Sequence, residues 1–257
     1  MMKTLIVERA DGVATVTMNR PKKKNAIDYT MFCELLEIFN EVTESVDDRV
    51  LVLTGADGNF CAGADLSAGN SPDRHMLASM QFYGSVGIAL HQVPKPTVAK
   101  IRGVAVGAGL NLALGCDLIA AAEDARLSEI FARRGLSLDV GGSWLLPRLI
   151  GLHRAKELAL LADIVSARDA ERMGLLNRVV PDSELDSVVD DWAKRLAAGP
   201  PIALAQSKRL LNNAFNYGLS EAMDAEGMAQ TVNLGTEDAR EALEAFMNKR
   251  DPVFKGR

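Results

Sequence analysis

Two segments rich in glycine and alanine, residues 59–66 and 103–110, contain the groups of this chain that could do chemistry. Each follows an apolar run typical of a buried strand, residues 49–54 and 97–101. Their small residues allow a backbone N–H to approach a ligand closely, and the second segment opens a predicted short helix whose N-terminus carries unpaired N–H groups. Two such donors suit the negative oxygen of an enolate or thioester. We therefore predict that the segments are the two halves of an oxyanion hole.

A carboxylate that could act as a base lies further along the chain. Asp139 stands between the apolar residues Leu138 and Val140, just before Gly141, Gly142 and an apolar, helix-like segment. Burial there would raise its pKa toward that of a useful general base. Alternatively, its side chain only caps the helix that begins near Gly141, because aspartate is a preferred N-cap residue. The local sequence leaves both interpretations open.

Other reactive patterns are weak. A dinucleotide-binding fingerprint begins at Gly107 and Gly109, but Leu112 occupies its third glycine position. Gly142-Ser143-Trp144 lacks the closing glycine of a nucleophile elbow, which disfavours a serine hydrolase. Cys61 has no histidine placed locally to deprotonate it, so we interpret it as a packing residue.

The amino-acid composition limits the classes of protein to which the chain could belong. The chain has 257 residues, of which 48% are hydrophobic and 25% are charged, which is typical of a globular protein with a sizeable core. The net charge of −5 gives no general attraction to nucleic acid or to an anionic membrane, so an anionic ligand requires a local basic site. The 3 cysteines are widely spaced and favour a reducing compartment, and no cysteine pattern suggests a metal. Without a signal peptide or membrane span, a cytoplasmic location is expected.

Strand and helix patterns interleave in the first part of the chain and would position these segments. Strands are expected at residues 5–8, 13–18, 49–54, 97–101 and 117–121, and helices after Asp28 and at residues 76–91 and 108–114. This succession predicts an α/β fold with a parallel, largely buried sheet. Further helices are expected at residues 155–162, 184–198, 202–217, 219–234 and 236–249. The break at Gly199-Pro200-Pro201 separates a core, residues 1–198, from a helical C-terminal region, residues 199–257.

The order of these motifs resembles that of the enoyl-CoA hydratase/isomerase (crotonase) superfamily. The resemblance spans essentially the whole chain and rests on the two glycine-rich segments and on Asn19-Arg20-Pro21, Asn25-Ala26, Cys116-Asp117 and residues 135–151 and 246–250. It implies a spiral of ββα turns with a helical C-terminal region that mediates trimerisation, often into a hexamer. It also implies that the donors of the hole are the backbone N–H groups of Ala64 and Ala108.

The resemblance also bears on the reaction. Hydratases of this superfamily hold water with two glutamates, whose positions correspond here to Asn111 and Phe131, and neither side chain can take up a proton. Glu129 is close in sequence, but on a helix its side chain would turn to another face. Asp139 matches the catalytic aspartate of enoyl- and dienoyl-CoA isomerases and of the ring-expanding isomerase of phenylacetate degradation. One base suffices for a 1,3-proton shift, so the resemblance favours an isomerase.

The leading hypothesis is therefore an acyl-CoA isomerase with Asp139 as the base and no cofactor, coenzyme A being part of the substrate. An enoyl-CoA hydratase and a non-catalytic acyl-CoA-binding protein remain as alternatives. The resemblance implies a homotrimer or hexamer in which the lysine loop 22–24 and the C-terminal segment of a neighbouring subunit contact CoA. The residues expected to contact substrate are Lys24, Ala26, Ala62, Asp65, Leu66, Phe131 and Trp144, with Lys249 and Phe254 from the neighbour.

Overall fold

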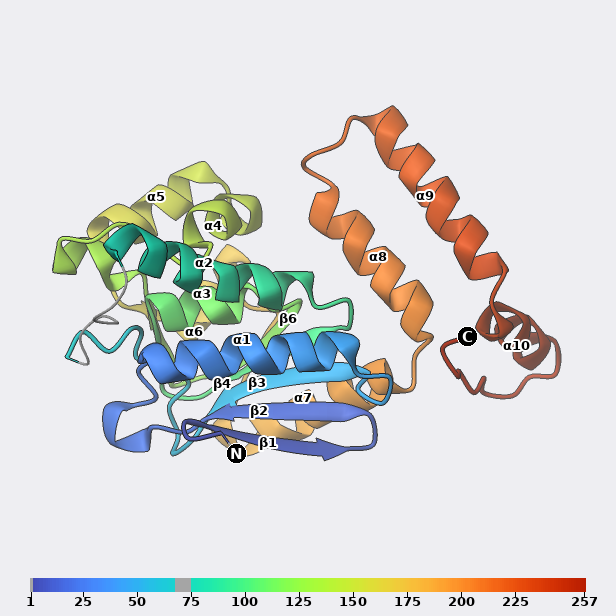
Figure 1. Ribbon diagram of the computed structural model, residues 1–257, viewed down its shortest axis with the longest axis horizontal. Coiled ribbons are helices and arrows are strands. Elements are labelled where there is room, and N and C mark those ends of the chain that lie inside the picture. The colour runs from blue at the N-terminus through green and yellow to red at the C-terminus, as the bar shows by residue number, and fades with distance from the viewer. Residues whose placement is uncertain (1, 68–74) are drawn as a thin grey trace.

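The computed structural model describes residues 2–67 and 75–257 (Figure 1). The strands are β1 (Leu5–Ala10), β2 (Val13–Met18), β3 (Val50–Gly55), β4 (Thr97–Ile101), β5 (Val104–Val106), β6 (Leu118–Ala122), β7 (Arg126–Ser128), β8 (Val165–Ser166) and β9 (Arg178–Val180). The α-helices are α1 (Tyr29–Glu44), α2 (Met76–Gln92), α3 (Ala108–Leu114), α4 (Gly142–Ile150), α5 (Leu152–Leu161), α6 (Ala167–Met173), α7 (Asp182–Ala197), α8 (Pro201–Asn213), α9 (Leu219–Leu234) and α10 (Glu237–Met247). Short 3₁₀ turns occur at η1 (Pro21–Lys23) and η2 (Ile130–Arg134).

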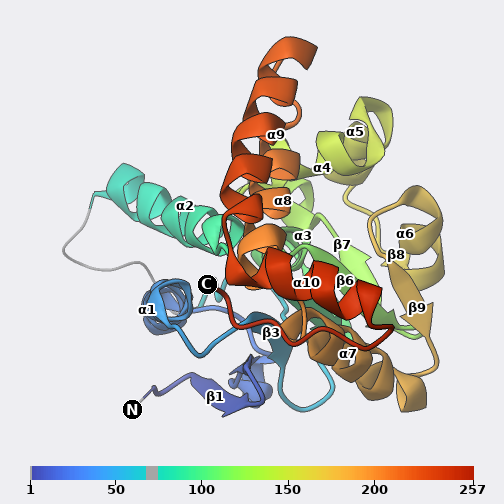
Figure 2. The same ribbon diagram turned by 90° about the vertical axis from the view of Figure 1, so that its right-hand side faces the viewer.

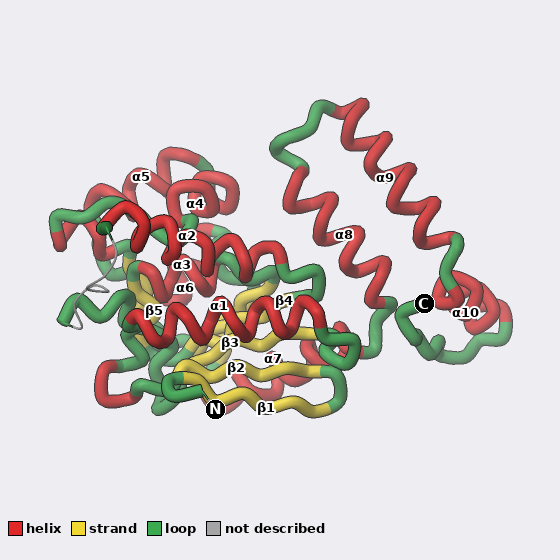
Figure 3. Tube along the Cα trace, in the orientation of Figure 1, coloured by secondary structure: helices red, strands yellow, loops and turns green. Residues whose placement is uncertain are grey.

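The strands of the described residues form a larger and a smaller sheet. In the larger sheet the order is β1-β2-β3-β4-β6-β9, in which β1 pairs antiparallel with β2 and the other neighbours are parallel. The smaller sheet has the order β5-β7-β8. Figure 3 shows β1, β2, β3 and β4 of the larger sheet side by side. The chain alternates between the sheets, since β4 is followed by β5 and α3, and β6 by β7 and η2. This repetition is the spiral of ββα turns that the resemblance implied.

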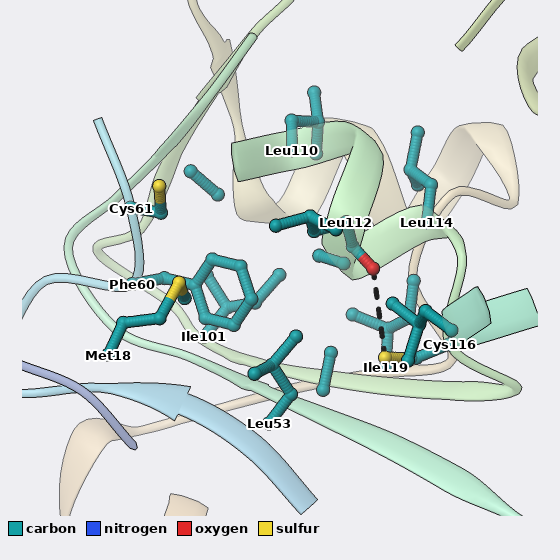
Figure 4. Packing of buried hydrophobic residues seen from close by; sticks show 14 of the residues in the cluster. Met18, Leu53, Phe60, Cys61, Ile101, Leu110, Leu112, Leu114, Cys116 and Ile119 are labelled. Atoms are coloured by element: carbon teal, nitrogen blue, oxygen red, sulfur yellow. Dashed lines mark hydrogen bonds between the residues drawn. The ribbon is translucent and has the colours of Figure 1, made fainter. Parts of the chain in front are cut away.

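The larger sheet is covered on both faces, which explains the continuous apolar runs of its parallel strands. Leu51 and Leu53 of β3 point into the larger core, together with residues of α1 and α3, whereas Val50 and Val52 point into a second core with α7. Figure 2 shows α1 and α7 on opposite sides of the strands. In Figure 4, Leu53 lies near Leu112 of α3 within the larger core. Burial of this helix against the sheet fixes the start of α3, where the second glycine-rich segment ends.

The helix after Asp28 begins where the sequence predicts. α1 starts at Tyr29, and the Asp28 side chain accepts a hydrogen bond of 2.9 Å from Met31 N–H. Leu35 and Ile38 on its inner face are buried in the larger core. The cap fixes where the preceding loop joins the helix, and this loop borders the site described below.

The C-terminal helices stand apart from the sheets. α8 and α9 contact each other, run in opposite directions and project from the body of the molecule (Figures 1 and 2). A salt bridge of 2.8 Å between Lys208 Nζ and Asp117 Oδ2 ties α8 to the core. Apolar side chains of α9 and α10 face outward, including Leu219 at 80% exposure and Phe246 at 79%. The division of the chain into residues 1–198 and 199–257 stays a prediction.

Candidate active site

The segment that follows β3 is bound directly to β5 and therefore lies beside the start of α3. Cys61 N–H donates to Val104 O and Val106 N–H donates to Cys61 O, both at 2.9 Å, which makes a parallel bridge between Cys61 and Ala105. The Cys61 side chain is fully buried, and burial raises the pKa of its thiol to about 12. Cys61 is therefore a packing residue, and the two glycine-rich segments form one unit.

Ala64 is held by a second parallel bridge, to the loop before α1. Ile27 N–H donates to Gly63 O and Asp65 N–H donates to Ile27 O, both at 2.8 Å. Because successive N–H groups of an extended segment alternate in direction, these bonds turn the Ala64 N–H to the opposite side. Ala64 lines a cavity there. The first predicted donor thus lies at a cavity wall.

Ion pairs with Arg20 hold this bridge in place. Arg20 Nη2 lies 2.9 Å from Asp65 Oδ2, and Arg20 Nε lies 3.2 Å from Asp28 Oδ2. Hydrogen bonds from the Ser67 hydroxyl and from Arg20 lower the pKa of Asp65 to about 2. Asp65 lines the cavity, but its carboxylate is ionised and bound to Arg20, so it anchors the loop and is a poor base.

Ala108 is the second predicted donor. It is the first residue of α3, a position whose N–H has no acceptor within the helix. Gly107 before it has φ +53°, and an added Cβ at Gly109 would lie only 2.6 Å from Cys61 Sγ. An added Cβ at Gly63 would lie 4.0 Å from Ala108 N. The small residues therefore allow the two segments to meet at the cavity.

The donors face a cavity with a volume of about 640 Å³, which is large enough for a small organic group. Its wall includes Ala62, Leu66 and Phe131, which are among the residues expected to contact substrate. Apolar side chains of α1, α2 and the segment 130–138 supply much of the remaining wall, and Arg134 contributes a cation. The cavity is therefore largely apolar, with a few polar groups at defined positions.

Asp139 lines the same cavity. Its Oδ1 is buried and accepts no hydrogen bond from any described group. Burial raises the pKa of Asp139 to about 6. The side chain caps no helix, because Gly141 is the N-cap of α4 and Gly142 N–H donates at 3.0 Å to the main-chain oxygen of Asp139. The capping interpretation is therefore wrong, and the carboxylate is free to accept a proton.

The structure also corrects our interpretation of Glu129. This residue is not inside a helix, since it precedes η2 with φ −85° and ψ 63°, and only 1% of it is exposed. Its Oε2 lies 3.5 Å from Asn111 Nδ2, which also donates to the main-chain oxygen of Asp139 at 3.0 Å. Burial and the charge of Asp139 raise the pKa of Glu129 to about 8. Although the described cavity wall does not include it, Glu129 is coupled to Asp139.

Lys24 and Ala26 lie in the loop behind Ala62 and outside the described cavity wall. Lys24 is exposed, and its carbonyl accepts a hydrogen bond of 3.0 Å from Ala62 N–H. Ala26 is buried, and its carbonyl accepts a hydrogen bond from Arg20. Both residues therefore support the first hole segment through their main chain.

Trp144 is also outside this cavity wall, which differs from our expectation. Its ring lies 5.2 Å from that of His91, and the Arg148 guanidinium lies 3.9 Å from the Trp144 ring centroid. Together with part of α8, Trp144 and His91 line a separate groove of about 620 Å³. Because Trp144 is close to Asp139 in sequence, we expected it to contact the acyl group, but its position on α4 directs its side chain to the separate groove.

Lys249 and Phe254 belong to the C-terminal segment, at the far end of β3. The Phe254 carbonyl accepts a hydrogen bond of 3.1 Å from Arg49 Nη1, and Arg49 directly precedes β3. The first hole segment follows the opposite end of the same strand. Within one protomer the two residues are therefore remote from the hole, and their contact with a neighbour's substrate stays a prediction.

Arg134 is a candidate functional residue that the sequence argument missed, and Glu129 is one that it considered and set aside. Arg134 follows Phe131 by three residues on η2, and a 3₁₀ turn places such residues on one side. That spacing would have indicated Arg134 if the turn had been recognised. Glu129 directly precedes the apolar residues Ile130 and Phe131, and this position is a sequence signal for a buried carboxylate.

No group of three or more His, Cys, Asp and Glu side chains within residues 2–67 and 75–257 could hold a metal ion. In the same ranges, every helix is too short or too polar to cross a membrane.

Comparisons with known proteins show the family to which the chain belongs. The family model of Enoyl-CoA hydratase/isomerase matches residues 8–257. The chain is 37% identical over 263 residues to 1,2-epoxyphenylacetyl-CoA isomerase of Escherichia coli K12, covering 100% of both chains. It is 32% identical over 254 residues to short-chain-enoyl-CoA hydratase of Clostridium acetobutylicum, covering 97% of this chain and 96% of the relative.

Solved structures show the same fold. The crystal structure of an enoyl-CoA hydratase from Bacillus anthracis superposes with a TM-score of 0.94 at 33% identity, over 99% of this chain and 100% of that one. An enoyl-CoA hydratase from Mycobacterium smegmatis gives a TM-score of 0.91 at 32% identity, over 98% and 99% of the two chains. The family match, the full-length relatives and the shared fold establish that this chain belongs to the enoyl-CoA hydratase/isomerase, or crotonase, family.

Proposed function

We propose that the chain is an acyl-CoA isomerase that shifts a double bond of an unsaturated acyl thioester, with Asp139 as its base. The observation that carries this proposal is the buried, unpartnered oxygen of Asp139, a residue that lines the same cavity as Ala64 and Ala108. A carboxylate with a pKa of about 6 is ionised at neutral pH and is still basic enough to accept a carbon-bound proton.

The thioester carbonyl oxygen binds between the N–H groups of Ala64 and Ala108. Asp139 removes a proton from one carbon of the acyl chain, and the electron pair moves through the conjugated system to the carbonyl oxygen. Each N–H donor then stabilises the negative oxygen by about 3 kcal/mol. The protonated Asp139 returns the same proton to the carbon two bonds away, so the double bond has moved and the enzyme is unchanged.

The second candidate is a hydratase, which the name of the Clostridium acetobutylicum relative supports. Hydration needs a group that activates water and a group that protonates the α-carbon. Phe131 places an apolar ring at the cavity, and the Asn111 amide cannot act as a general acid or base and is bound to Glu129 and to the main-chain oxygen of Asp139. Among the carboxylates of the described cavity wall, Asp28 and Asp65 pair with Arg20, whereas Asp139 has a buried oxygen without a hydrogen-bond partner, which favours isomerisation.

A non-catalytic acyl-CoA-binding protein is the third candidate. Such a protein gains nothing from a buried carboxylate without a hydrogen-bond partner, because desolvating that group costs free energy. The buried Asp139 oxygen without a hydrogen-bond partner therefore favours an enzyme over a binding protein. The 37% identity to the E. coli isomerase supports the same choice.

We also propose that the active assembly is a homotrimer or hexamer. The outward apolar side chains of α9 and α10, such as Met223, Leu234 and Phe246, need a partner surface of similar chemistry. CoA would enter beside the exposed lysine loop 22–24, where Lys23 Nζ already contacts Ser67 Oγ at 3.0 Å, near the cavity residue Leu66. Lys249 and Phe254 of a neighbouring subunit would complete this basic site.

The test is turnover of a 3-enoyl-CoA and of a 2-enoyl-CoA, followed by the gain or loss of conjugated absorbance. The wild type should convert the 3-enoyl thioester and leave crotonyl-CoA almost unhydrated. Asp139→Asn should lower isomerisation by about 100-fold or more, with acyl-CoA affinity retained. Asp191→Asn, a surface change of the same kind in an exposed pair with Arg195, is the matched control. Near-normal isomerisation by Asp139→Asn would refute the proposal, and rapid hydration by the wild type would favour the hydratase.

A further inference from the structure

Three buried oxygen atoms around Asn111 lack hydrogen-bond partners. They are Asn111 Oδ1, Glu129 Oε1 and Asp139 Oδ1, none of which accepts a hydrogen bond from the described residues. Asn111 Nδ2 contacts both neighbours, at 3.5 Å from Glu129 Oε2 and 3.0 Å from the Asp139 main-chain oxygen. An added Cβ at Gly142 would lie 2.5 Å from this nitrogen, so the cluster is closely packed. The cluster therefore contains more hydrogen-bond acceptors than donors, and a proton on one of its carboxyl groups would supply a donor.

Among the described residues, no cation forms an ion pair with either carboxyl group or lowers its pKa. The influences on the pKa of Glu129 are burial, then the charge of Asp139, and then the hydrogen bond from Asn111. Of the arginines of the adjoining η2 turn, Arg133 pairs with Asp163, and Arg134 lines the same cavity as Asp139 but forms no ion pair with it. Two ionised carboxylates in such surroundings would repel each other strongly, so one of them must remain protonated.

We propose that Glu129 and Asp139 hold a single proton between them across Asn111, and that Glu129 keeps this proton while Asp139 acts as the base. Glu129 is then a positioning residue, which acts on the substrate only through Asp139. The inference rests on the proposed role of Asp139 in isomerisation. It assigns a function to a buried acid that touches no substrate.

The proton balance of the reaction is unaffected by this arrangement. Asp139 takes one proton from the substrate and returns it, while the proton of Glu129 stays where it is. If Glu129 ionises at high pH, a second negative charge enters the dry pocket beside the developing enolate. That charge opposes the charge that forms on the thioester oxygen, and turnover should fall.

The pH dependence of kcat/KM tests this role. In the wild type we expect activity to rise through the ionisation of Asp139 near pH 6 and to fall again as Glu129 ionises near pH 8. Glu129→Gln keeps the shape and the neutral state, so it should retain at least about a third of wild-type activity at pH 7 and lose the alkaline limb. A structural role alone would lower activity at every pH and leave the shape of the profile unchanged. An unaltered alkaline limb in Glu129→Gln would overturn the proposal.

Infrared titration gives a readout that does not depend on turnover. The carbonyl stretch of a buried protonated carboxyl should be present in the wild type at pH 7 and should disappear near pH 8. In Asp139→Asn it should disappear at a lower pH, since burial still holds the proton but the neighbouring negative charge is gone. A wild type without this band at pH 7, or a midpoint unchanged in Asp139→Asn, would refute the shared proton even if Glu129→Gln does not fold. An Asp139→Asn protein with full turnover would instead refute only the proposed function.

Discussion

Replacing Gly109 by alanine should separate the two halves of the oxyanion hole while changing no group that touches substrate. The new Cβ would lie 2.6 Å from Cys61 Cβ and Sγ and 2.8 Å from the Cys61 oxygen. Cys61 cannot yield, because its main chain is bound on both sides to β5 and its side chain is fully buried. To restore a contact distance of about 3.5 Å, α3 and its Ala108 N–H must move by about 1 Å.

Such a displacement has separate costs for stability and for catalysis. Overpacking should lower the free energy of unfolding by about 1–3 kcal/mol. A misplacement of about 1 Å in the active site should lower kcat by about 100-fold. Because the rest of the cavity wall is unchanged, affinity for a saturated acyl-CoA should fall much less.

Turnover of a 3-enoyl-CoA, urea unfolding and calorimetric titration with acyl-CoA measure these three quantities. Gly84→Ala is the matched control, because an added Cβ there meets nothing within 4 Å and alanine favours the helix. Gly84→Ala should keep wild-type turnover and equal or slightly higher stability. If folded Gly109→Ala also turns over at the wild-type rate, the close approach of the segments does not determine the geometry of the hole.

Four further predictions follow from the same site. Since Asp139 must be ionised to act and its pKa is about 6, kcat/KM should fall about tenfold per pH unit below that value, and a profile flat to pH 5 would exclude it as the base. Burial raises the pKa of Glu129 from 4.5 to about 8, so the stabilisation of the folded state by protonated Glu129 is fully present below pH 4.5 and is lost as pH rises toward 8, by up to about 5 kcal/mol. Urea unfolding of Glu129→Gln should lack this loss of stability, and parallel curves of unfolding free energy against pH for the two proteins would contradict the prediction. Phe131→Glu alone should not hydrate crotonyl-CoA rapidly, since Asn111 supplies no second carboxylate, and rapid hydration in a spectrophotometric assay would disprove that argument. Truncation after Met247 should weaken CoA binding, measured by calorimetry, more than it lowers Tm, and unchanged affinity would argue against a shared site.

The sequence alone predicted the elements whose structure depends on neighbouring residues. The bounds of α3 and α9 agree with the helical spacing of apolar residues, and the Asp28 cap was read from residue type and position. The glycine-rich segments were recognised for the same reason, because small residues permit close approach wherever they occur. The fold class followed from the alternation of strand and helix patterns, and the family resemblance named the two donors.

Only the tertiary structure decided which residues meet. The short strands β5, β7, β8 and β9 were not expected, because strands of this length are stable only when distant segments pair with them. Glu129 was expected inside a helix but precedes a 3₁₀ turn, and the packing of Asn111 and Asp139 around it could not be predicted from sequence spacing. Trp144, adjacent in sequence to the site, lies on another groove, whereas Ala64 and Ala108 converge from separate turns of the spiral. Periodicity and capping act over a few residues, but these contacts depend on sheet register and burial across the whole chain, which no local pattern encodes.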